Sequence, residues 1–495
     1  MTTVAQKPAR SGRATELVLL AIALAIGLSA WVLVTIGVSD QVLPDGFAKV
    51  SIVAAVGVLA VHLGVRKLAP YADPIFLPAA VALNGLGLAM IQRIDFELKA
   101  PEVGGQLKLT IVGVVLMVLT LVAIRDHRIL RKFTWTSLIL GIFLLLLPMA
   151  PGIGRTINGA RLWIAVGGFT FQPAELAKIM FAIFFAGYLV VQRDNLALAG
   201  KKVWGIQLPR LRHLAPILVA WIACLGILVL EKDFGTALLF FGLFVAMLYI
   251  ATERVSWILI GGGLSLVGVF FVVQMMPHIM SRVTSWLHAL DPEVYDAPYG
   301  SYQLVQGWFG MASGGLFGTG LGNGYPTKSY AANSDFIIAS FGEELGMAGL
   351  LAILSIYLLI TVRALTTGIR LRDGFGKLLA AGLGFTIALQ CFVVVGGVTR
   401  VIPLTGLAMP FLALGGSALL TNWIVIGLLL RMSDAARRPH VASSEPLPSI
   451  DDFVSDDDDE PTSDTSTSDI SDDDAGSDEL DGTDADANPT EVVRL

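Results

Sequence analysis

The chain has 495 residues, of which 55% are hydrophobic and 15% are charged, whereas about a quarter are charged in ordinary soluble domains. This composition excludes a soluble multidomain enzyme and indicates a membrane protein with many spanning segments. The formal net charge of −6 conceals a division, because residues 441–495 carry 19 acidic residues and one basic residue. The preceding 440 residues therefore carry a net charge of +12.

Twelve segments are long and apolar enough to cross a bilayer, which takes about 20 mostly apolar residues. The first segment follows Lys7, Arg10 and Arg13 and is longer than a signal-peptide core, so we expect an uncleaved helix. The predicted spanning helices cover residues 17–38, 47–65, 75–91, 107–124, 134–150, 174–192, 214–230, 234–252, 255–276, 337–361, 377–398 and 406–430. The sequence therefore predicts an all-α polytopic membrane protein.

Loop charge predicts the orientation of these helices. With the N-terminus in the cytoplasm, 22 of the 33 basic residues before residue 441 fall in cytoplasmic segments, where Lys and Arg are preferred. Both termini are therefore expected in the cytoplasm. Two long loops, 151–173 and 277–336, then lie outside the cell. The second is rich in aromatic residues and glycine, which is typical of a functional loop rather than a disordered one.

Two basic residues are candidates for binding an anion near the outer side. Lys178 follows Glu175 by three positions, so both lie on one face of a helix. They could form an ion pair that holds the helix end, or line a polar cavity in which Lys178 faces a phosphate. Arg161 could anchor the membrane interface beside Trp163, or bind a diphosphate with its planar guanidinium.

Two further outer turns carry polar motifs. Glu231, Lys232 and Asp233 separate two predicted helices, so a tight turn is expected there, with Asp233 as a candidate helix cap. Arg400 lies in a turn before the last predicted helix. Pro410 and glycines at 415–416 interrupt that helix, which indicates either a packing kink or backbone that lines a cavity.

The large outer loop contains three acidic residues within six positions, namely Asp291, Glu293 and Asp296. Carboxylates this close could disfavour each other's ionisation, which would help one of them act as a general base. The alternative is a solvated acidic loop. Farther along the chain, Asp335 is a candidate helix cap and Glu344 is expected to face a cavity.

Several classes of function are excluded by absent motifs. The sequence has no Gly-Lys-Ser/Thr phosphate-binding loop, its six histidines are scattered, and its two cysteines lie in apolar runs. Its basic residues are dispersed in short loops, so we expect no nucleic-acid partner. The residues alone fit two kinds of protein, which are an enzyme acting on a lipid-linked anion and a transporter.

Beyond these physical arguments, the sequence resembles the SEDS family of shape, elongation, division and sporulation proteins, typified by RodA and FtsW. The resemblance covers about residues 75–432. It rests on Asn-Gly-Ala-Arg-x-Trp-Ile at 158–164, Gln-Pro-Ala-Glu-Leu-Ala-Lys at 172–178, Asp-Phe-Gly-Thr-Ala at 233–237, Gly-Ser-Tyr-Gln-Leu-Val-Gln at 300–306, Gly-Thr-Gly-Leu-Gly-Asn-Gly at 318–324, Asp-Phe-Ile-Ile-Ala-Ser-Phe-Gly-Glu-Glu-Leu-Gly at 335–346, Ile-Pro-Leu-Thr-Gly at 402–406 and Gly-Gly-Ser-x-Leu-x-x-Asn-Trp at 415–423.

The resemblance implies a ten-helix core at 75–432 that contains the outer loop 277–336. It leaves a short cytoplasmic N-terminus at 1–16 and an added pair of helices at 17–74. Residues 433–495 are expected to form a disordered acidic tail in the cytoplasm. The added pair and Gly-Gly-Val-Thr-Arg at 396–400 resemble elongation-type members from actinobacteria more than division-type members.

The resemblance also implies a reaction at the bacterial cell membrane. Lipid II would be joined to a glycan strand held on undecaprenyl diphosphate, beside membrane lipids and a class B penicillin-binding protein. Alignment on Tyr302 and Gln303 places the family's catalytic aspartate at Asp296, which would act as general base. The diphosphate leaving group needs cationic stabilisation, for which Arg161, Lys178 and Arg400 are the candidates. Glu175, Asp233 and Gln303 complete the expected substrate-binding set.

Three points stay open at the level of sequence. A divalent cation, Mg²⁺ or Mn²⁺, could assist the reaction, although no metal site is readable. The chain departs from the family pattern around the catalytic position, where Asp296-Ala297-Pro298-Tyr299-Gly300 replaces the usual Asp-Pro-x-Gly. The alternatives to an elongation-type polymerase are a division-type polymerase, a lipid II flippase, and a scaffold that recruits a transpeptidase.

Overall fold

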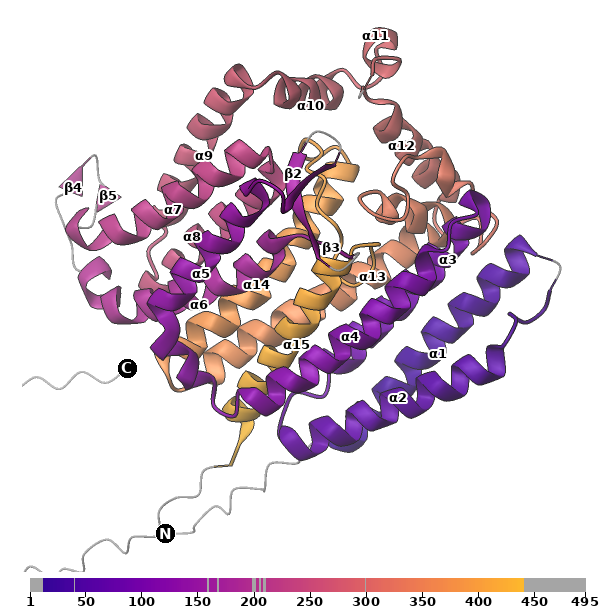
Figure 1. Ribbon diagram of the computed structural model, residues 1–495, viewed down its shortest axis with the longest axis horizontal. Coiled ribbons are helices and arrows are strands. Elements are labelled where there is room, and N and C mark those ends of the chain that lie inside the picture. Colours follow the sequence, from indigo (N-terminus) through magenta and orange to yellow (C-terminus); the bar gives the residue numbers. More distant parts are fainter. Residues whose placement is uncertain are drawn as a thin grey trace, which may run out of the picture. The chain divides into compact units, whose positions relative to one another are not determined.

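The computed structural model describes residues 12–39, 41–157, 160–166, 169–197, 202–203, 206–207, 211–298 and 300–439, and this part is mainly helical (Figure 1). Several predictions concern residues outside these ranges. They include the basic residues Lys7 and Arg10, the first two residues of the 158–164 motif, Tyr299, and the acidic tail from residue 440 onward.

A long helix occupies each predicted spanning segment. These helices are α1 (Arg13–Val38), α2 (Phe47–Leu68), α3 (Phe76–Leu98), α4 (Glu102–Ala123), α5 (Thr134–Leu146), α6 (Pro173–Ala197), α7 (Leu211–Glu231), α8 (Phe234–Thr252), α9 (Ser256–Met275), α13 (Ile337–Arg370), α14 (Gly374–Val398) and α15 (Gly416–Arg437). Short 3-10 helices, η1 (His127–Phe133) and η2 (Leu147–Met149), flank α5.

Among the residues described, ten helices are long and apolar enough to cross a membrane. Shorter apolar stretches at Trp221–Glu231 and Ser256–Phe271 belong to α7 and α9. The predicted all-α polytopic membrane fold is therefore confirmed. The total of twelve spans and the cytoplasmic location of both termini stay predictions.

The N-terminal helices α1 and α2 lie side by side at one edge of the bundle (Figure 1). α1 packs closely on α3, since a Cβ atom added to Gly27 would lie 3.1 Å from Cα of Gly85. A buried carboxylate, Glu16 in α1, forms an ion pair with Arg13 and a 2.8 Å hydrogen bond with Nδ1 of His62 in α2. These contacts join α1 to α2, and α1 to α3 of the core.

The first long outer loop contains strands that the sequence did not predict. β1 (Gly154–Ile157), β2 (Ala160–Val166) and β3 (Phe169–Phe171) form an antiparallel sheet in the order β1-β2-β3. Arg155 pairs with Trp163, and Ile164 pairs with Phe171. A second small sheet joins β4 (Lys202–Val203) to β5 (Ile206–Gln207). β2 has seven residues but only one polar side chain, Arg161, and the other strands have two to four residues, so the sequence shows no clear alternation here.

The second long outer loop is also structured. It contains α10 (Pro277–Leu287), α11 (Pro292–Tyr295), α12 (Tyr302–Gly314) and the 3-10 helix η3 (Pro326–Lys328). The first of these helices crosses the end of the bundle at the top of Figure 1, and α11 follows it. The loop then returns to α13, whose first turns are buried.

The predicted start of the last helix is wrong. The sequence predicts a helix from residue 406, but residues 401–415 are not helical and α15 begins at Gly416. Pro410 has no N–H group to donate within a helix. Carbonyls of the segment bind other elements instead, because Gln390 Nε2 donates to Ala408 O at 2.9 Å and the Tyr357 hydroxyl donates to Pro410 O.

A second interruption lies inside α13, at Gly346. Its φ of 69° is in the left-handed region, which favours glycine. A Cβ atom there would also lie 2.3 Å from the backbone nitrogen of Gly318. The break therefore separates a short first part of α13, which carries Glu343 and Glu344, from its long apolar part.

Candidate active site

Lys178 lies deep in the bundle rather than on an open surface. Its side chain is 2% exposed, and its Nζ lies 2.7 Å from Glu175 Oε2. The same nitrogen donates a 3.0 Å hydrogen bond to Gln390 Oε1 on α14. The structure therefore contains the ion pair that the sequence offered as one interpretation. A role for Lys178 in substrate binding stays a prediction.

Asp233 caps α8, as the sequence predicts. Its carboxylate accepts hydrogen bonds from Thr236 N at 3.0 Å and Thr236 Oγ1 at 2.7 Å. The tight turn before it is made by Lys232, whose φ is 64°. Gln172 Nε2 also donates to Asp233 at 3.3 Å, and Gln172 N donates to Ser417 Oγ at 2.8 Å. These bonds bring the starts of α6, α8 and α15 together at one polar junction.

The two candidate arginines both hold backbone carbonyls. Arg161, in β2, donates from Nη2 to Ala150 O at 2.9 Å and is partly buried. Arg400 donates from Nε to Trp286 O at 2.9 Å and from Nη2 to Leu287 O at 2.8 Å. Its guanidinium carbon also lies 5.4 Å from the centroid of the Trp308 ring. In this structure the two arginines hold loops in place.

Asp296 differs from these residues because it is exposed. It lies directly after α11, and its carboxylate makes no hydrogen bond or ion pair with the residues that the structure describes. Asp291, the alternative base, is within 3.1 Å of His288 Nδ1. Within the described part of the chain, Asp296 makes no hydrogen bond or ion pair with the candidate cations Arg161, Lys178 and Arg400. Asp296 thus remains available to a substrate hydroxyl.

The segment that carries Asp296 is joined to α12. Tyr295 OH accepts a 2.8 Å hydrogen bond from Gln306 Nε2, and its ring lies 5.3 Å from that of Tyr302. The neighbouring Gln303 donates from Nε2 to Tyr330 O at 2.7 Å and accepts at its backbone oxygen from Ser329. Gln303 therefore connects α12 to the chain that precedes α13.

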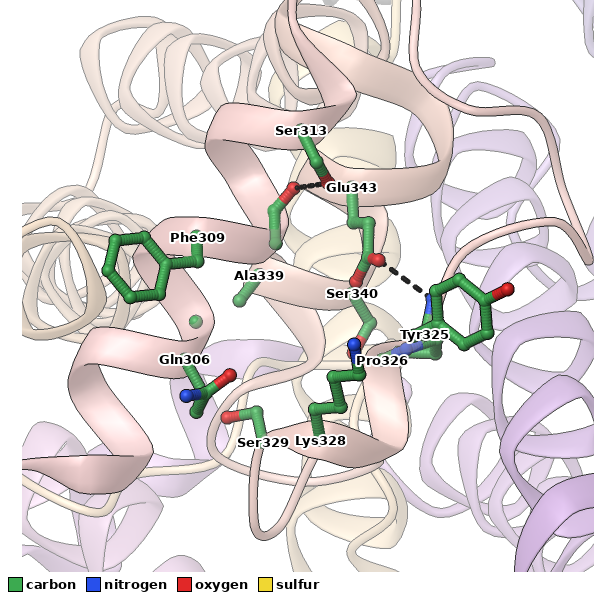
Figure 2. Close-up of a pocket in the computed structure, with 12 residues that line it drawn as sticks. Gln306, Phe309, Ser313, Tyr325, Pro326, Lys328, Ser329, Ala339, Ser340 and Glu343 are labelled. Atoms are coloured by element: carbon green, nitrogen blue, oxygen red, sulfur yellow. Dashed lines mark hydrogen bonds between the residues drawn. The ribbon is translucent and has the colours of Figure 1, made fainter.

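A pocket of about 330 Å³ lies beside this segment, between α12, η3 and the first turns of α13 (Figure 2). Figure 2 shows the Lys328 ammonium group near Ser340 and the Glu343 carboxylate on the same wall. The Glu343 carboxylate accepts a 2.7 Å hydrogen bond from Tyr325 N. The pocket thus offers hydroxyl, amine and carboxylate groups to a polar ligand.

The expectation that Glu344 faces a cavity is wrong. Glu344 is fully buried and pairs with Arg93 Nε at 2.8 Å, while Gly322 N donates to its other oxygen at 3.0 Å. Glu343 is the carboxylate that lines the pocket. Adjacent helical residues point about 100° apart, so one faces Arg93 of α3 and the other faces the opening.

The sequence interpretation missed Arg282 of α10. It is the only charged residue in that helix and donates from Nη1 to Leu404 O at 3.1 Å and Thr405 O at 3.0 Å. Asp335 does not cap α13, contrary to the prediction. The Asp335 and Arg282 side chains both lie beside Gly406. A Cβ atom added to Gly406 would be 3.6 Å from Asp335 Oδ2 and 3.9 Å from Arg282 Nη2. Burial raises the pKa of Asp335 to about 6 against the opposing influence of the Arg282 charge.

Among the described residues, no group of three or more His, Cys, Asp or Glu side chains could hold a metal ion. Residues at the starts of α6, α8 and α15 form one polar junction, and residues of α12, η3 and the first turns of α13 line the pocket.

Residues 75–438 match the family model of FtsW, RodA and SpoVE, described as cell cycle protein. The chain belongs to this family. The match begins after α1 and α2 and includes both the polar junction and the outer loop. Family membership and the apolar helices make this a multi-pass protein of the bacterial cell membrane.

Named relatives are similar over most of the chain. The peptidoglycan glycosyltransferase RodA of Mycobacterium tuberculosis is 44% identical over 440 residues, covering 87% of this chain and 92% of the relative. That of Mycobacterium leprae is 46% identical over 386 residues, covering 76% and 81%. A probable peptidoglycan glycosyltransferase FtsW of Geobacter is 33% identical over 314 residues, covering 63% and 82%.

Two solved structures share the fold. One is a chain of a peptidoglycan synthase complex studied for its coordination of polymerization and crosslinking, with a TM-score of 0.61 at 22% identity. The other is a mutant of the rod shape determining protein RodA of Thermus thermophilus, with a TM-score of 0.53 at 22% identity. Each comparison covers 74% of this chain and 99% of the other.

Proposed function

We propose that this protein is a peptidoglycan glycosyltransferase of the RodA type, which joins lipid II to a growing undecaprenyl-diphosphate-linked glycan strand during cell elongation. The observation that carries the proposal is 44% identity to the RodA of Mycobacterium tuberculosis over 87% of the chain. The lower identity to the probable FtsW of Geobacter, 33%, favours the elongation type over the division type.

In the proposed reaction, Asp296 is the general base. Its carboxylate takes the proton of the GlcNAc 4-hydroxyl of lipid II while that oxygen attacks the anomeric carbon of the donor glycan. The new glycosidic bond forms as the bond between the anomeric carbon and the diphosphate oxygen breaks, and the lipid diphosphate leaves. An exposed carboxylate without a protein partner can accept this proton, and general base catalysis contributes about 10²–10⁴-fold.

The leaving diphosphate requires positive charge close to its oxygens. Arg161, Lys178 and Arg400 are the proposed sources, and each would exchange a present protein contact for a phosphate oxygen. A divalent cation, Mg²⁺ or Mn²⁺, would supply further charge if it enters bound to the diphosphate. We propose that Glu175, Asp233 and Gln303 orient these groups through the polar junction and α12.

We also propose a class B penicillin-binding protein as the partner that crosslinks the product. This chain shares its fold with a chain of a peptidoglycan synthase complex over 74% of its length. Polymerisation and crosslinking act in succession on one glycan strand, so a partner that holds the strand at the outer loop would join the two reactions.

The test is to incubate the purified full-length protein with fluorescent lipid II, alone and with the cognate penicillin-binding protein, and to separate the products on a gel. Glycan polymer in either condition supports the proposal. Translocation of labelled lipid II across vesicles without polymer would replace the enzyme with a flippase. Neither activity in the presence of the partner would leave a scaffold that recruits the transpeptidase.

A further inference from the structure

A second pocket, of about 260 Å³, lies at the end of the bundle where α4 and α15 finish. It is small compared with the pockets that hold drug-sized ligands, which measure about 300–1,000 Å³, so it suits a compact group. Four arginines, two aspartates, one histidine and one alanine line it, namely Arg125, Arg128, Arg431, Arg438, Asp126, Asp434, His127 and Ala435.

The aspartates of this pocket already have partners within the protein. Asp434 is fully buried and accepts hydrogen bonds from Tyr71 N at 2.8 Å and Arg438 Nε at 2.8 Å. Asp126 caps η1 by accepting from Arg128 N at 3.0 Å. The lining has four arginines and only two aspartates, so positive charge is in excess and the pocket favours an anion over a cation.

Two of the arginines keep their guanidinium groups available. Arg125 is exposed, and among the residues described its side chain makes no hydrogen bond or ion pair. The Arg128 side chain is 62% exposed, and its ion pair is a long one of 3.5 Å to Asp373. Asp373 is more closely bound to His127 Nε2, at 2.9 Å. Both exposed groups can therefore bind oxyanion oxygens through their planar forks.

The remaining wall of the pocket is held firmly. Arg431 is buried and donates from Nη1 to Leu68 O at 2.9 Å and from Nη2 to Leu121 O. It thereby ties the ends of α2 and α4 to α15. These bonds complement the negative end of α4, which explains Arg431 as a structural residue. They do not explain Arg125 and Arg128, which donate to no carbonyl among the described residues.

The segment beside the pocket, η1 and the start of α5, has the composition of a membrane interface. Ile129, Phe133 and Trp135 are each about half exposed, at 47%, 50% and 56%. Large apolar side chains interspersed with exposed basic residues are typical of segments at the level of lipid headgroups. Loop charge predicts that this end faces the cytoplasm, where the membrane surface is anionic.

We propose that the pocket formed by Arg125, Arg128, Arg431 and Arg438 binds the phosphate group of an anionic phospholipid headgroup. The exposed arginines supply the charge-assisted hydrogen bonds, and the apolar side chains of η1 and α5 lie along the acyl chains. This site is far along the chain from Asp296 and requires no step of the glycosyl transfer, so lipid binding can be measured without lipid II.

The test is a titration of the purified full-length protein with short-chain phosphatidylglycerol, followed by native mass spectrometry. The double variant Arg125→Gln/Arg128→Gln is expected to weaken the Kd by about tenfold or more, because it removes two charge-assisted contacts. The matched control is Arg131→Gln/Lys132→Gln, which removes the same charge from exposed positions of η1 outside the pocket. This control is expected to bind as the wild type does.

Three outcomes would overturn the proposal. Equal weakening in both double variants would indicate general surface charge, and unchanged binding in Arg125→Gln/Arg128→Gln would exclude the pocket. Inorganic phosphate that displaces phosphatidylglycerol at similar concentration would assign the site to a soluble phosphate instead of a lipid. Arg125→Gln alone, which removes no contact within the described structure, separates lost binding from lost folding, and thermal unfolding of each variant is measured beside it.

Discussion

Two buried ion pairs of the helix bundle and one exposed carboxylate of the outer loop are held in opposite ways. In the bundle, Lys178 pairs with Glu175 and Arg93 pairs with Glu344. In the outer loop, Asp296 is exposed and makes no side-chain bond with the described residues. An uncompensated buried charge is strongly destabilising, so these two bundle cations are paired, whereas an exposed carboxylate is free to react. The bundle pairs therefore hold the fold, whereas Asp296 is the carboxylate proposed to react.

The largest expected effect on stability comes from breaking a bundle pair. Lys178→Met leaves Glu175 buried without its cation, which should cost about 3–5 kcal/mol. We expect a marked fall in Tm, measured by thermal unfolding in detergent. In the double variant Lys178→Met/Glu175→Gln the uncompensated charge is gone, so much of the lost stability should return. A single variant that unfolds like the wild type but makes no polymer would contradict the expected loss of stability and would leave Lys178 only its proposed role at the diphosphate.

A smaller effect is expected at the turn between α13 and α14, where Asp373 meets His127. Burial raises the pKa of Asp373, but hydrogen bonds from His127 and Gly376 N and the charges of His127 and Arg128 lower it further, to about 2. The folded-state pKa is thus below the ordinary value of 3.8. This carboxylate therefore stabilises the fold above pH 3.8, and the contribution disappears as pH falls through about 2.

Replacing the Asp373 carboxylate should alter the stability of the fold without altering the glycosyl transfer. Asp373→Asn should lower the free energy of unfolding at pH 7 by about 2 kcal/mol. Near pH 2 the variant and the wild type should differ little. Thermal unfolding across this pH range measures both differences, and an equal deficit at every pH would mean that lost packing, rather than lost charge, is responsible.

The smallest effect is expected from the acidic tail. Its composition, with 19 acidic residues from residue 441 onward, predicts a segment that builds no core. Loop charge predicts that it lies in the cytoplasm, away from the outer loop. Deletion of residues 441–495 should therefore leave polymerisation largely intact in the lipid II gel assay. Complete loss of polymer by this truncation, with its Tm unchanged, would contradict that expectation.

The helices could be predicted because their length and apolarity follow from the bilayer that they cross. The prediction failed at residues 406–415, where the composition is apolar but Pro410 and Gly415 favour non-helical backbone. Carbonyls of this segment are bound by Gln390 and Tyr357 from distant positions in the sequence. Hydropathy does not encode such tertiary bonds, so the true start of α15 required the structure.

The site could be predicted where its contacts are local in sequence. The Glu175–Lys178 pair and the Asp233 cap lie within one helical turn, and both are present. Arg282 was missed because its neighbours Leu404 and Asp335 come from other elements. Its position as the only charge of α10 was the available signal. The assignment of Asp296 came from the family resemblance, and its role stays a prediction.

The proposed mechanism gives different roles to two carboxylates of the outer loop, Asp296 and Asp291. Initial polymerisation rates of Asp296→Ala and Asp291→Ala should be measured with labelled lipid II and the same partner, with Tm recorded for each. We predict that Asp296→Ala lowers the rate by about 10²–10⁴-fold with little change in Tm. Asp291→Ala, which removes only an exposed pair with His288, should retain most activity. Polymer made equally well by Asp296→Ala would contradict the account.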